Sequence, residues 1–329
     1  SWLAFLGVCI YVIHPRILAD ANYNVKDSLC MALFTISLYY AVCVIQKQTV
    51  VNTILFLLFS ALCTTARIVG GEIIAACLFV LFVKSIREKT WKKFFLVFFC
   101  ICIFFIGIFI AMTPQAWSDP FHVLLRIAKT FSNYTVWEGD VKYFGTYIDG
   151  HTLPWHYLFT WIFITTPLVY QLLWSGGLIM FVRDFIHVIQ KKRELLVSLE
   201  QLFLFLVLII PFIYVLVLNP TLYNGWRHFY FVYPCLALWA VIGMQRLFTL
   251  NIIKIHHGTL ALLTVSMTFT CFWILKNHPY EYVYFQPVIR SYAQKNFDLD
   301  YWALTEQEMY EYIGATDGRE DLLVQSYSG

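Results

Sequence analysis

The sequence contains little charge. Only 13% of its 329 residues are Asp, Glu, Lys or Arg, whereas 60% are hydrophobic and 19% are aromatic. Because soluble globular domains carry about 25% charged residues, this composition excludes an ordinary soluble fold and indicates a polytopic membrane protein. The net charge of +3 is small and the basic residues are scattered, so no nucleic-acid partner is expected.

Metal-binding and disulfide patterns are also missing from the sequence. All nine cysteines fall within apolar runs, without histidines or further cysteines at the spacing of a zinc site. We therefore interpret them as packing thiols. Internal repeats, low-complexity segments and the period-2 alternation of barrel strands are absent too, so helices are the expected membrane-spanning elements.

Long apolar runs dominate what is present, and a helix needs about 20 such residues to cross a bilayer. The sequence predicts an all-α integral membrane protein with about nine transmembrane helices, at residues 1–13, 28–46, 50–66, 72–84, 94–112, 156–182, 201–218, 228–245 and 258–275. The first run opens at Ser1 without a charged region before it, which indicates a chain that begins inside a span and is not a signal peptide.

The distribution of Lys and Arg predicts the orientation. Twelve of the 23 basic residues lie in four short connections, at 47–50, 84–93, 183–193 and 246–257. Since short cytoplasmic loops are rich in Lys and Arg, these connections are placed inside, with the amino end cytoplasmic and the carboxyl end outside.

The same count gives the domain organisation. A transmembrane domain spans residues 1–276 and includes a long outer loop at 113–155. An outer carboxyl-terminal segment follows at 277–329, with a helix expected near 305–312. Long loops that contain their own aromatic residues are usually ordered over a site.

The tightest group of polar side chains lies between the first two apolar runs, from His14 to Asp27, and includes Arg16 and Lys26. Asp27 opens the span at 28, where the amino end of a helix favours an anion. Two interpretations stay open. Asp27 is either an N-cap beside a snorkelling Lys26, or a carboxylate that binds a metal or orients an acceptor while Arg16 or Lys26 neutralises a phosphate.

Arg67 and Glu72 flank a glycine pair at the outer ends of consecutive predicted helices. They form either a surface ion pair, which would contribute little energy, or a phosphate site through Arg67.

A third polar group follows residue 219. Asn224-Gly225 predicts a turn, and Arg227-His228 follow it at the mouth of a span. Trp226 and Arg227 are either interfacial anchors, or Arg227 and His228 form a phosphate clamp.

His151 and His156 lie on either side of Trp155 in the long outer loop. They are either solvated loop residues or groups for acid–base catalysis and sugar stacking.

Four motifs occur together in chain order: His14-Pro15-Arg16 with Asn24-x-Lys26-Asp27, Leu153-Pro154-Trp155-His156-Tyr157 with Thr165-Thr166-Pro167, Asn224-Gly225-Trp226-Arg227-His228, and His278-Pro279-Tyr280 and Tyr284-Phe285 with Asp300-Tyr301-Trp302. In this combination the chain resembles the GT-C polytopic glycosyltransferases, specifically the bacterial branch similar to protein O-mannosyltransferases and aminoarabinose transferases.

The resemblance implies an enzyme that moves a sugar, with inversion, from a polyprenyl-phosphate donor to a protein, glycan or lipid acceptor. Its site would face the extracytoplasmic side of the bacterial plasma membrane. In the family an aspartate of the first outer loop is the general base. That loop falls before Ser1, so the catalytic aspartate is expected upstream of this sequence.

Residue roles follow from the same resemblance. It implies supporting roles in catalysis for Asp27 and His156, and it makes Asp27 the candidate ligand of a divalent metal ion of unspecified identity. Donor-phosphate binding is assigned to Arg16, Lys26, Arg67, Asn224, Arg227 and His228.

Two rival functions stay open. A transporter or flippase of a lipid-linked saccharide would place ionisable groups near the bilayer midplane and would use discontinuous helices and internal repeats. A non-catalytic membrane subunit that binds prenyl phosphate would carry the phosphate site without the base.

Overall fold

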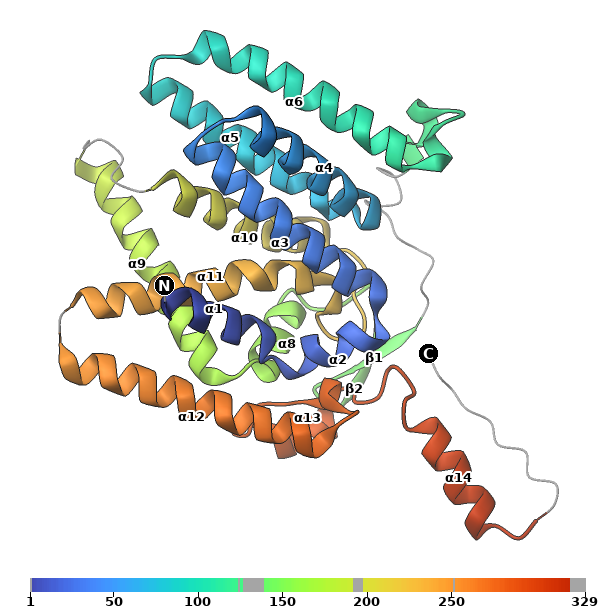
Figure 1. The fold of residues 1–329 in the computed structure, drawn as a ribbon. Helices are drawn as coiled ribbons and strands as arrows, with labels where there is room; N and C mark the ends of the chain where they lie inside the picture. The colour runs from blue at the N-terminus through green and yellow to red at the C-terminus, as the bar shows by residue number, and fades with distance from the viewer. Residues whose placement is uncertain (1, 124, 127–138, 192–197, 251, 320–329) are drawn as a thin grey trace.

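A computed structural model describes residues 2–123, 125–126, 139–191, 198–250 and 252–319. Figure 1 shows that this part of the chain is almost entirely helical, with one small hairpin of strands. Parts of the predicted loop 113–155, of the connection 183–193 and of the segment 277–329 lie outside the described residues.

Six helical stretches are long and apolar enough to cross a membrane, which supports the assignment as an all-α integral membrane protein. They are α3 (Val25–Gln46), η1 (Ile68–Gly70) with α5 (Gly71–Arg87), α6 (Trp91–Met112), α10 (Leu199–Leu218), η3 (Arg227–Val232) with α11 (Tyr233–Thr249), and α12 (Ile253–Asn277). A seventh span results if α1 (Trp2–Val12) and α2 (Pro15–Tyr23), which are bent by 61° at their junction, count as one.

With α1 and α2 counted as one span, two predicted spans account for the difference between seven and nine. The run at 156–182 is divided into α8 (Tyr157–Thr165) and α9 (Leu168–Lys191), because Pro167 lacks an amide donor and disfavours helical geometry in the residue before it. The run at 50–66 forms α4 (Val50–Ala66), an apolar helix of 17 residues. The number of spans and their orientation therefore stay predictions.

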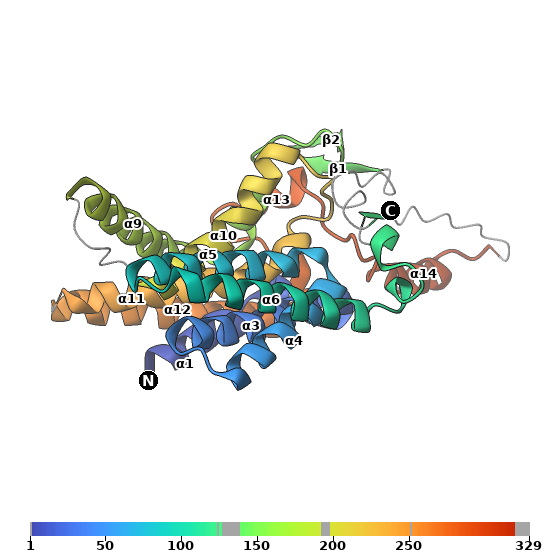
Figure 2. The same ribbon diagram turned by 90° about the horizontal axis from the view of Figure 1, so that it is seen from above.

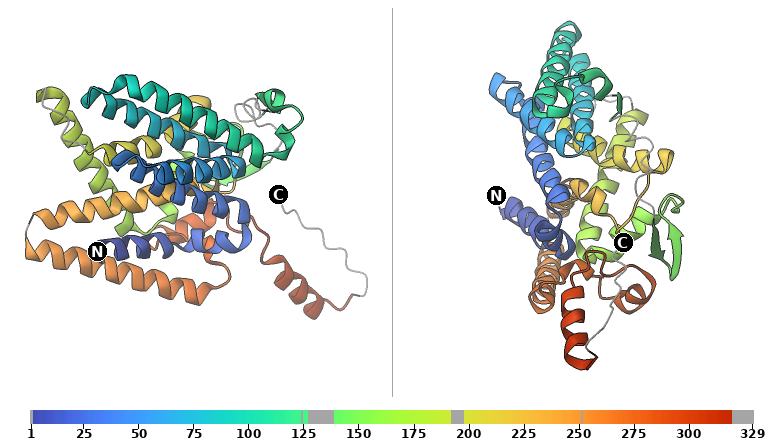
Figure 3. Two further views of the ribbon diagram at one scale, coloured as in Figure 1. Left: turned by 45° about the horizontal axis from the view of Figure 1, so that its top comes forward. Right: turned by 90° about the vertical axis from the view of Figure 1, so that its right-hand side faces the viewer.

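The helix ends gather in two groups (Figures 1 and 3). One group contains the starts of α3, α5 and α11 and the ends of α4, α6 and α12, together with α2; we call it the site end. The connections α3–α4, α5–α6, α9–α10 and α11–α12 lie at the other end, which we call the loop end. The described parts of the predicted outer segments thus lie at one end, and the described parts of the predicted inner connections lie at the other.

Close helix packing holds this arrangement together. At the crossing of α9 and α11, a Cβ atom on Gly177 would lie 2.3 Å from the Trp239 carbonyl oxygen, and one on Gly243 would lie 2.2 Å from the Leu173 carbonyl oxygen. Only glycine fits at both positions, and such small residues let helix backbones approach each other in membrane proteins.

A β-hairpin lies at the site end, within the predicted loop 113–155. Strand β1 (Asp140–Tyr143) pairs antiparallel with β2 (Thr146–Asp149), and Asp140 lies opposite Asp149. Figure 2 shows the hairpin at one edge of the molecule, next to the end of α10 and to α13. The sequence did not predict these strands, because each is only four residues long.

Most of the carboxyl-terminal segment packs against the helices. It contains η4 (Glu281–Val283), α13 (Arg290–Asn296) and α14 (Glu306–Thr316), the last of which confirms the helix expected near 305–312. Phe285 and Phe297 are buried in the core, and the Gln286 amide donates to the Ile164 carbonyl oxygen at 2.9 Å. Figure 1 shows that α14 projects away from the body.

Candidate functional site

Helix α2 brings two charged side chains into the interior of the site end. His14 caps the helix, its Nδ1 accepting from the Ile17 amide at 3.4 Å, and Pro15 occupies the first helical position. Arg16 and Asp20 follow four residues apart, on one face of the helix, and are 1% and 0% exposed. Charged groups this deeply buried need partners in the protein or in a ligand.

Asp20 has several partners. Its carboxylate accepts from the Tyr230 hydroxyl at 2.6 Å, from the Trp302 indole N–H at 2.8 Å and from the Tyr301 hydroxyl at 3.3 Å. Arg16 and Arg227 both act on it electrostatically. Asp20 therefore joins α2 to η3 and to the carboxyl-terminal segment.

Arg16 is only partly satisfied. Its Nε donates to the Tyr284 carbonyl oxygen at 3.0 Å. The guanidinium carbon lies 5.0 Å from the centre of the Trp161 ring and 4.9 Å from that of Phe285, which is cation–π geometry. Within the described residues, Nη2 of Arg16 is buried without a hydrogen-bond partner.

The predicted turn at Asn224-Gly225 is confirmed and lies against Arg16. Both residues have positive φ, 55° and 73°, as a tight turn of this sequence requires. A Cβ atom on Gly225 would be 3.7 Å from Nη1 of Arg16 and 3.4 Å from the Trp161 ring. The following Trp226 is 1% exposed and donates to Thr165 Oγ1 at 2.9 Å, so its interpretation as an interfacial anchor is wrong.

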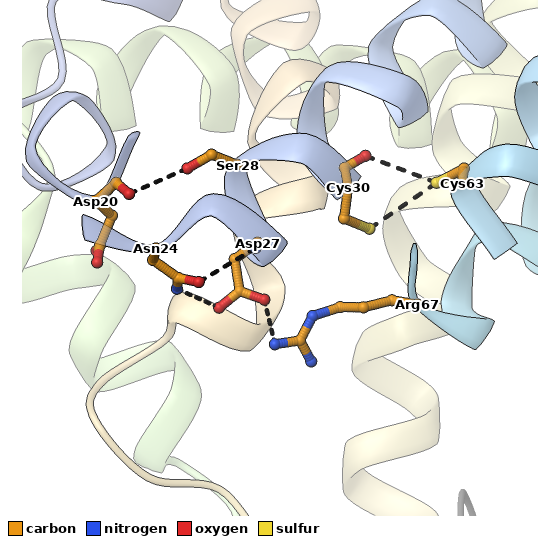
Figure 4. Close-up of polar contacts among 7 residues, drawn as sticks. All are labelled: Asp20, Asn24, Asp27, Ser28, Cys30, Cys63 and Arg67. Carbon is orange, nitrogen blue, oxygen red and sulfur yellow. Dashed lines mark hydrogen bonds and ion pairs between the residues drawn. The ribbon is translucent and has the colours of Figure 1, made fainter. Parts of the chain in front are cut away.

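Asp27 lies at the start of α3 and faces Arg67 (Figure 4). Asn24 caps the helix by accepting from the Asp27 amide at 3.2 Å, so the interpretation of Asp27 itself as the N-cap is wrong. The Asp27 carboxylate forms an ion pair with Arg67 and accepts from the Asn24 amide group. The predicted surface ion pair between Arg67 and Glu72 does not form. In the described part of the chain, Glu72 Oε1 is buried without a hydrogen-bond partner.

His228 lies within electrostatic range of three other basic side chains, one of which is the Arg67 of this ion pair. Lys26, Arg67 and Arg227 all act electrostatically on His228. We call these residues, Lys26, Arg67, Arg227 and His228, the basic cluster. They come from α3, the end of α4 and η3, which are distant in sequence.

Aromatic rings hold two members of the basic cluster. The Arg227 guanidinium carbon lies 4.9 Å from the ring centres of both Tyr223 and Trp302, and the rings of His228 and Tyr223 are 4.6 Å apart. Nε of Arg227 and Nε of Arg67 are buried and lack hydrogen-bond partners among the described residues. The cluster therefore has spare donors for an anion.

His156 belongs to a different group of residues. Its Nδ1 lies 2.6 Å from the Tyr143 hydroxyl, which also donates to Thr160 Oγ1 at 2.8 Å. Its ring neighbours are Tyr143, Phe144 and Trp155. The structure thus places His156 beside the hairpin, while six other predicted site residues gather around Asp20 and Asp27.

The carboxylates of the carboxyl-terminal segment support the loop that contains Tyr301 and Trp302. Burial acts to raise the pKa of Asp300, but hydrogen bonds from Thr305, Tyr282 and Leu304 outweigh it and lower that pKa. Burial raises the pKa of Asp298, which accepts from the Lys142 amide at 3.0 Å. Asp298 thereby ties the segment to β1.

A divalent metal ion does not fit the contacts of Asp27. Its carboxylate is engaged by Arg67 and Asn24. Within the described ranges, no group of three His, Cys, Asp or Glu side chains is placed to hold a metal ion. We therefore derive no chemical step from a metal.

Sequence reasoning missed Asp20 and the three side chains that donate to it, Tyr230, Tyr301 and Trp302. One local signal was available, because Arg16 and Asp20 have the i, i+4 spacing of an ion pair on a helix. The partners are 210 to 282 residues away in the chain and carry no local signal.

The chain was also compared with known proteins. No protein-family model matches it, and neither a curated protein nor a solved structure matches it.

Proposed function

We propose that this protein is an integral membrane glycosyltransferase that takes a sugar from a polyprenyl-phosphate donor and passes it to a protein, glycan or lipid acceptor. The observation that carries the proposal is the basic cluster at the site end of the apolar helices. A phosphate presents several anionic oxygens, and guanidinium groups match them with paired donors.

The free donors of the cluster support an anionic ligand. Nε of Arg67 and Nε of Arg227 are buried without partners among the described residues, and an unsatisfied buried donor costs about 1–3 kcal/mol. A phosphate that accepts from both would remove this cost. Arg16, behind Asp20, has a third such nitrogen in Nη2, and the Asn224 turn lies against it.

A lipid tail has a surface next to this cluster. On α3 the apolar side chains of Val25, Leu29 and Ile36 are exposed on the protein surface, and Lys26 follows Val25 directly. In a bilayer this face contacts acyl chains, so a prenyl chain would lie along it while its phosphate reaches the basic cluster. This arrangement fits a lipid-linked donor better than a free nucleotide sugar.

In the proposed enzyme the chain has nine spans, its amino end is cytoplasmic, and its site faces outward from a bacterial plasma membrane. Asp27 orients Arg67, and His156 serves on the acceptor side next to the hairpin. The general base is not assigned to Asp20 or Asp27, because both carboxylates are already engaged.

One rival function is favoured by a specific observation. The carboxylates of Asp20 and Asp27 are already hydrogen-bonded or ion-paired, so neither is free to act as a general base. A non-catalytic subunit that binds prenyl phosphate would have such a site. The Lys, Arg, Asp and Glu residues of α3, α5, α6 and α10 lie in the first or last turns of these helices, which argues against a flippase. The 61° break between α1 and α2 is a discontinuity that a flippase would share.

A transfer assay tests the proposal. Membranes that contain the protein are supplied with a panel of tritiated polyprenyl-phosphate monosaccharides, and label in protein, glycan and lipid fractions is measured. We expect Arg227→Ala to abolish transfer, while the control Arg183→Ala, which removes a 65% exposed side chain at the loop end, leaves it unchanged. Normal transfer by Arg227→Ala would remove Arg227 from the site. Donor binding without transfer by the wild-type protein would support the non-catalytic subunit.

A further inference from the structure

Two cysteine thiols lie near the Asp27–Arg67 ion pair, above it in Figure 4. The sulfur atoms of Cys30 and Cys63 are 3.9 Å apart, and the Cys63 thiol also lies 3.6 Å from the Cys30 carbonyl oxygen. Cys30 comes from α3 and Cys63 from α4, and both are at most 1% exposed. A general packing role does not require two thiols from different helices to face each other.

The positions of the two thiols suit a cross-link. A disulfide has a sulfur–sulfur distance of about 2.05 Å, so side-chain rotation has to close a gap that is already within van der Waals contact. The Cys63 sulfur is also confined on a second side, because a Cβ atom on Gly70 of η1 would lie 2.9 Å from it. We propose that Cys30 and Cys63 are a redox-sensitive pair, which an apolar two-electron oxidant converts to a disulfide between α3 and α4.

The reaction balances without any other group of the protein. An azo compound such as diamide adds one thiol across its N=N bond, and the second sulfur then attacks the first. The sulfur–sulfur bond forms, the sulfur–nitrogen bond breaks, and the reagent leaves as the hydrazine with both protons and both electrons. A quinone in the bilayer would be reduced to the hydroquinone in the same overall exchange.

A buried carboxyl lies next to the pair. Glu72 interacts electrostatically with Cys30, Cys63 and Cys235. Its Oε1 is buried without a hydrogen-bond partner in the described part of the chain. This carboxyl is not assigned a role in the exchange, because the reagent takes up both thiol protons.

The disulfide would act on the ion pair. Cys30 follows Asp27 by three residues and Cys63 precedes Arg67 by four, so each thiol lies one helical turn from a partner of the pair. A covalent bond at this point fixes the ends of α3 and α4 against each other, and so limits how far Arg67 can adjust its free Nε toward a phosphate while it stays paired with Asp27. This consequence rests on the proposed function, whereas the cross-link does not.

Peptide mapping tests the cross-link. Protein in lipid nanodiscs is treated with diamide, alkylated and analysed by mass spectrometry. We expect a linked peptide between Cys30 and Cys63 in the wild-type protein and in the control Cys77→Ser, which removes another buried thiol. We expect no such peptide in Cys30→Ser or Cys63→Ser. If the exposed Cys100 is oxidised while Cys30 and Cys63 are recovered as separate alkylated peptides, the pair is overturned.

A binding measurement separates this inference from the proposed function. We expect oxidation to weaken binding of polyprenyl phosphate about tenfold, as expected for loss of one charge-assisted hydrogen bond. Dithiothreitol should restore binding, and Cys30→Ser should be insensitive to diamide. A linked peptide in a protein that never binds polyprenyl phosphate would overturn the proposed function and keep the pair. If the linked peptide forms but polyprenyl-phosphate binding is unchanged, the disulfide between Cys30 and Cys63 does not control Arg67.

Discussion

The two ends of the helix bundle contain the same kinds of charged residues in opposite circumstances. At the loop end, Lys84 donates to the carbonyl oxygen of Ile45 at 2.6 Å and so completes the end of α3, while Asp184 pairs with Arg183 at 3.0 Å and with Arg246 at 3.2 Å. At the site end, Arg16 is buried and Arg67 and Arg227 are partly buried, and Arg16 and Arg227 lie against aromatic rings. Each of the three has a buried nitrogen without a hydrogen-bond partner among the described residues. Basic residues at the loop end thus complete and orient helices, whereas those at the site end are arranged for a ligand.

The largest expected difference between the ends concerns their carboxylates. Asp20→Ala removes an acceptor from three donors and leaves Arg16 and Arg227 without their shared counter-charge. We expect it to lower the free energy of unfolding by about 3–5 kcal/mol, measured by SDS titration in mixed micelles. The matched variant Asp184→Ala, at a partly exposed pair, should cost less than about 1 kcal/mol. Equal losses for the two variants would contradict the distinction between the ends.

The next largest effect is expected at the Asp27–Arg67 pair. Asp27→Asn removes the charge from a carboxyl that is 3% exposed, and it should lower the free energy of unfolding by about 1–3 kcal/mol and impair transfer. A double-mutant cycle with Arg67→Gln should give a coupling energy of at least about 0.5 kcal/mol. Additive effects of the two substitutions would mean that the Asp27–Arg67 ion pair does not contribute to the free energy of unfolding.

Trp302 tests how the carboxyl-terminal segment supports the site. Trp302→Phe keeps an aromatic ring near Arg227 but removes the indole N–H that Asp20 accepts. We expect a loss of about 1 kcal/mol in thermal or SDS unfolding. The control Trp155→Phe changes a ring that is 67% exposed and should have no measurable effect. Equal stabilities of Trp302→Phe and Trp155→Phe would mean that the hydrogen bond from Trp302 to Asp20 does not stabilise the carboxyl-terminal segment.

The smallest expected effect is a pH dependence at Asp300. The folded-state pKa of Asp300 lies below its ordinary value of 3.8, so its stabilisation is present above that pH and is lost as the pH falls through the folded value. Because Asp300 is partly exposed, Asp300→Asn should cost only a few tenths of a kcal/mol at pH 6. Asp298 has a raised pKa and opposes this trend, since its stabilisation is present below pH 3.8 and is lost as the pH rises through the raised value. The difference between wild type and Asp300→Asn should shrink from pH 5 to pH 3, and a growing difference would contradict the sign.

Much of the architecture was predictable because it depends on local pattern. Composition alone indicated the membrane class, and the apolar runs gave the positions of α3, α5, α6, α10, α11 and α12 to within a few residues. The break between α8 and α9 was missed although Pro167 marks it, because the apolar character of the run continues on both sides of the proline.

The site was predictable where its residues occur in short motifs. Arg16, Lys26, Asp27 and Arg227 stood out as charges at the edges of apolar runs. Asp20 did not, because its role depends on Tyr230 and Trp302, more than 200 residues away in the chain. The separation of His156 from the basic cluster likewise depends on tertiary contacts with Tyr143.

The most direct test of the account is equilibrium binding of a polyprenyl phosphate to the purified protein in nanodiscs. The wild type, Arg227→Gln at the site end and Arg183→Gln at the loop end are compared by native mass spectrometry. Removal of one charge-assisted hydrogen bond predicts a loss of affinity of about 10- to 100-fold for Arg227→Gln and wild-type affinity for Arg183→Gln. Equal affinities of all three proteins, or no binding by the wild type, would contradict the claim that the basic cluster is a lipid-phosphate site.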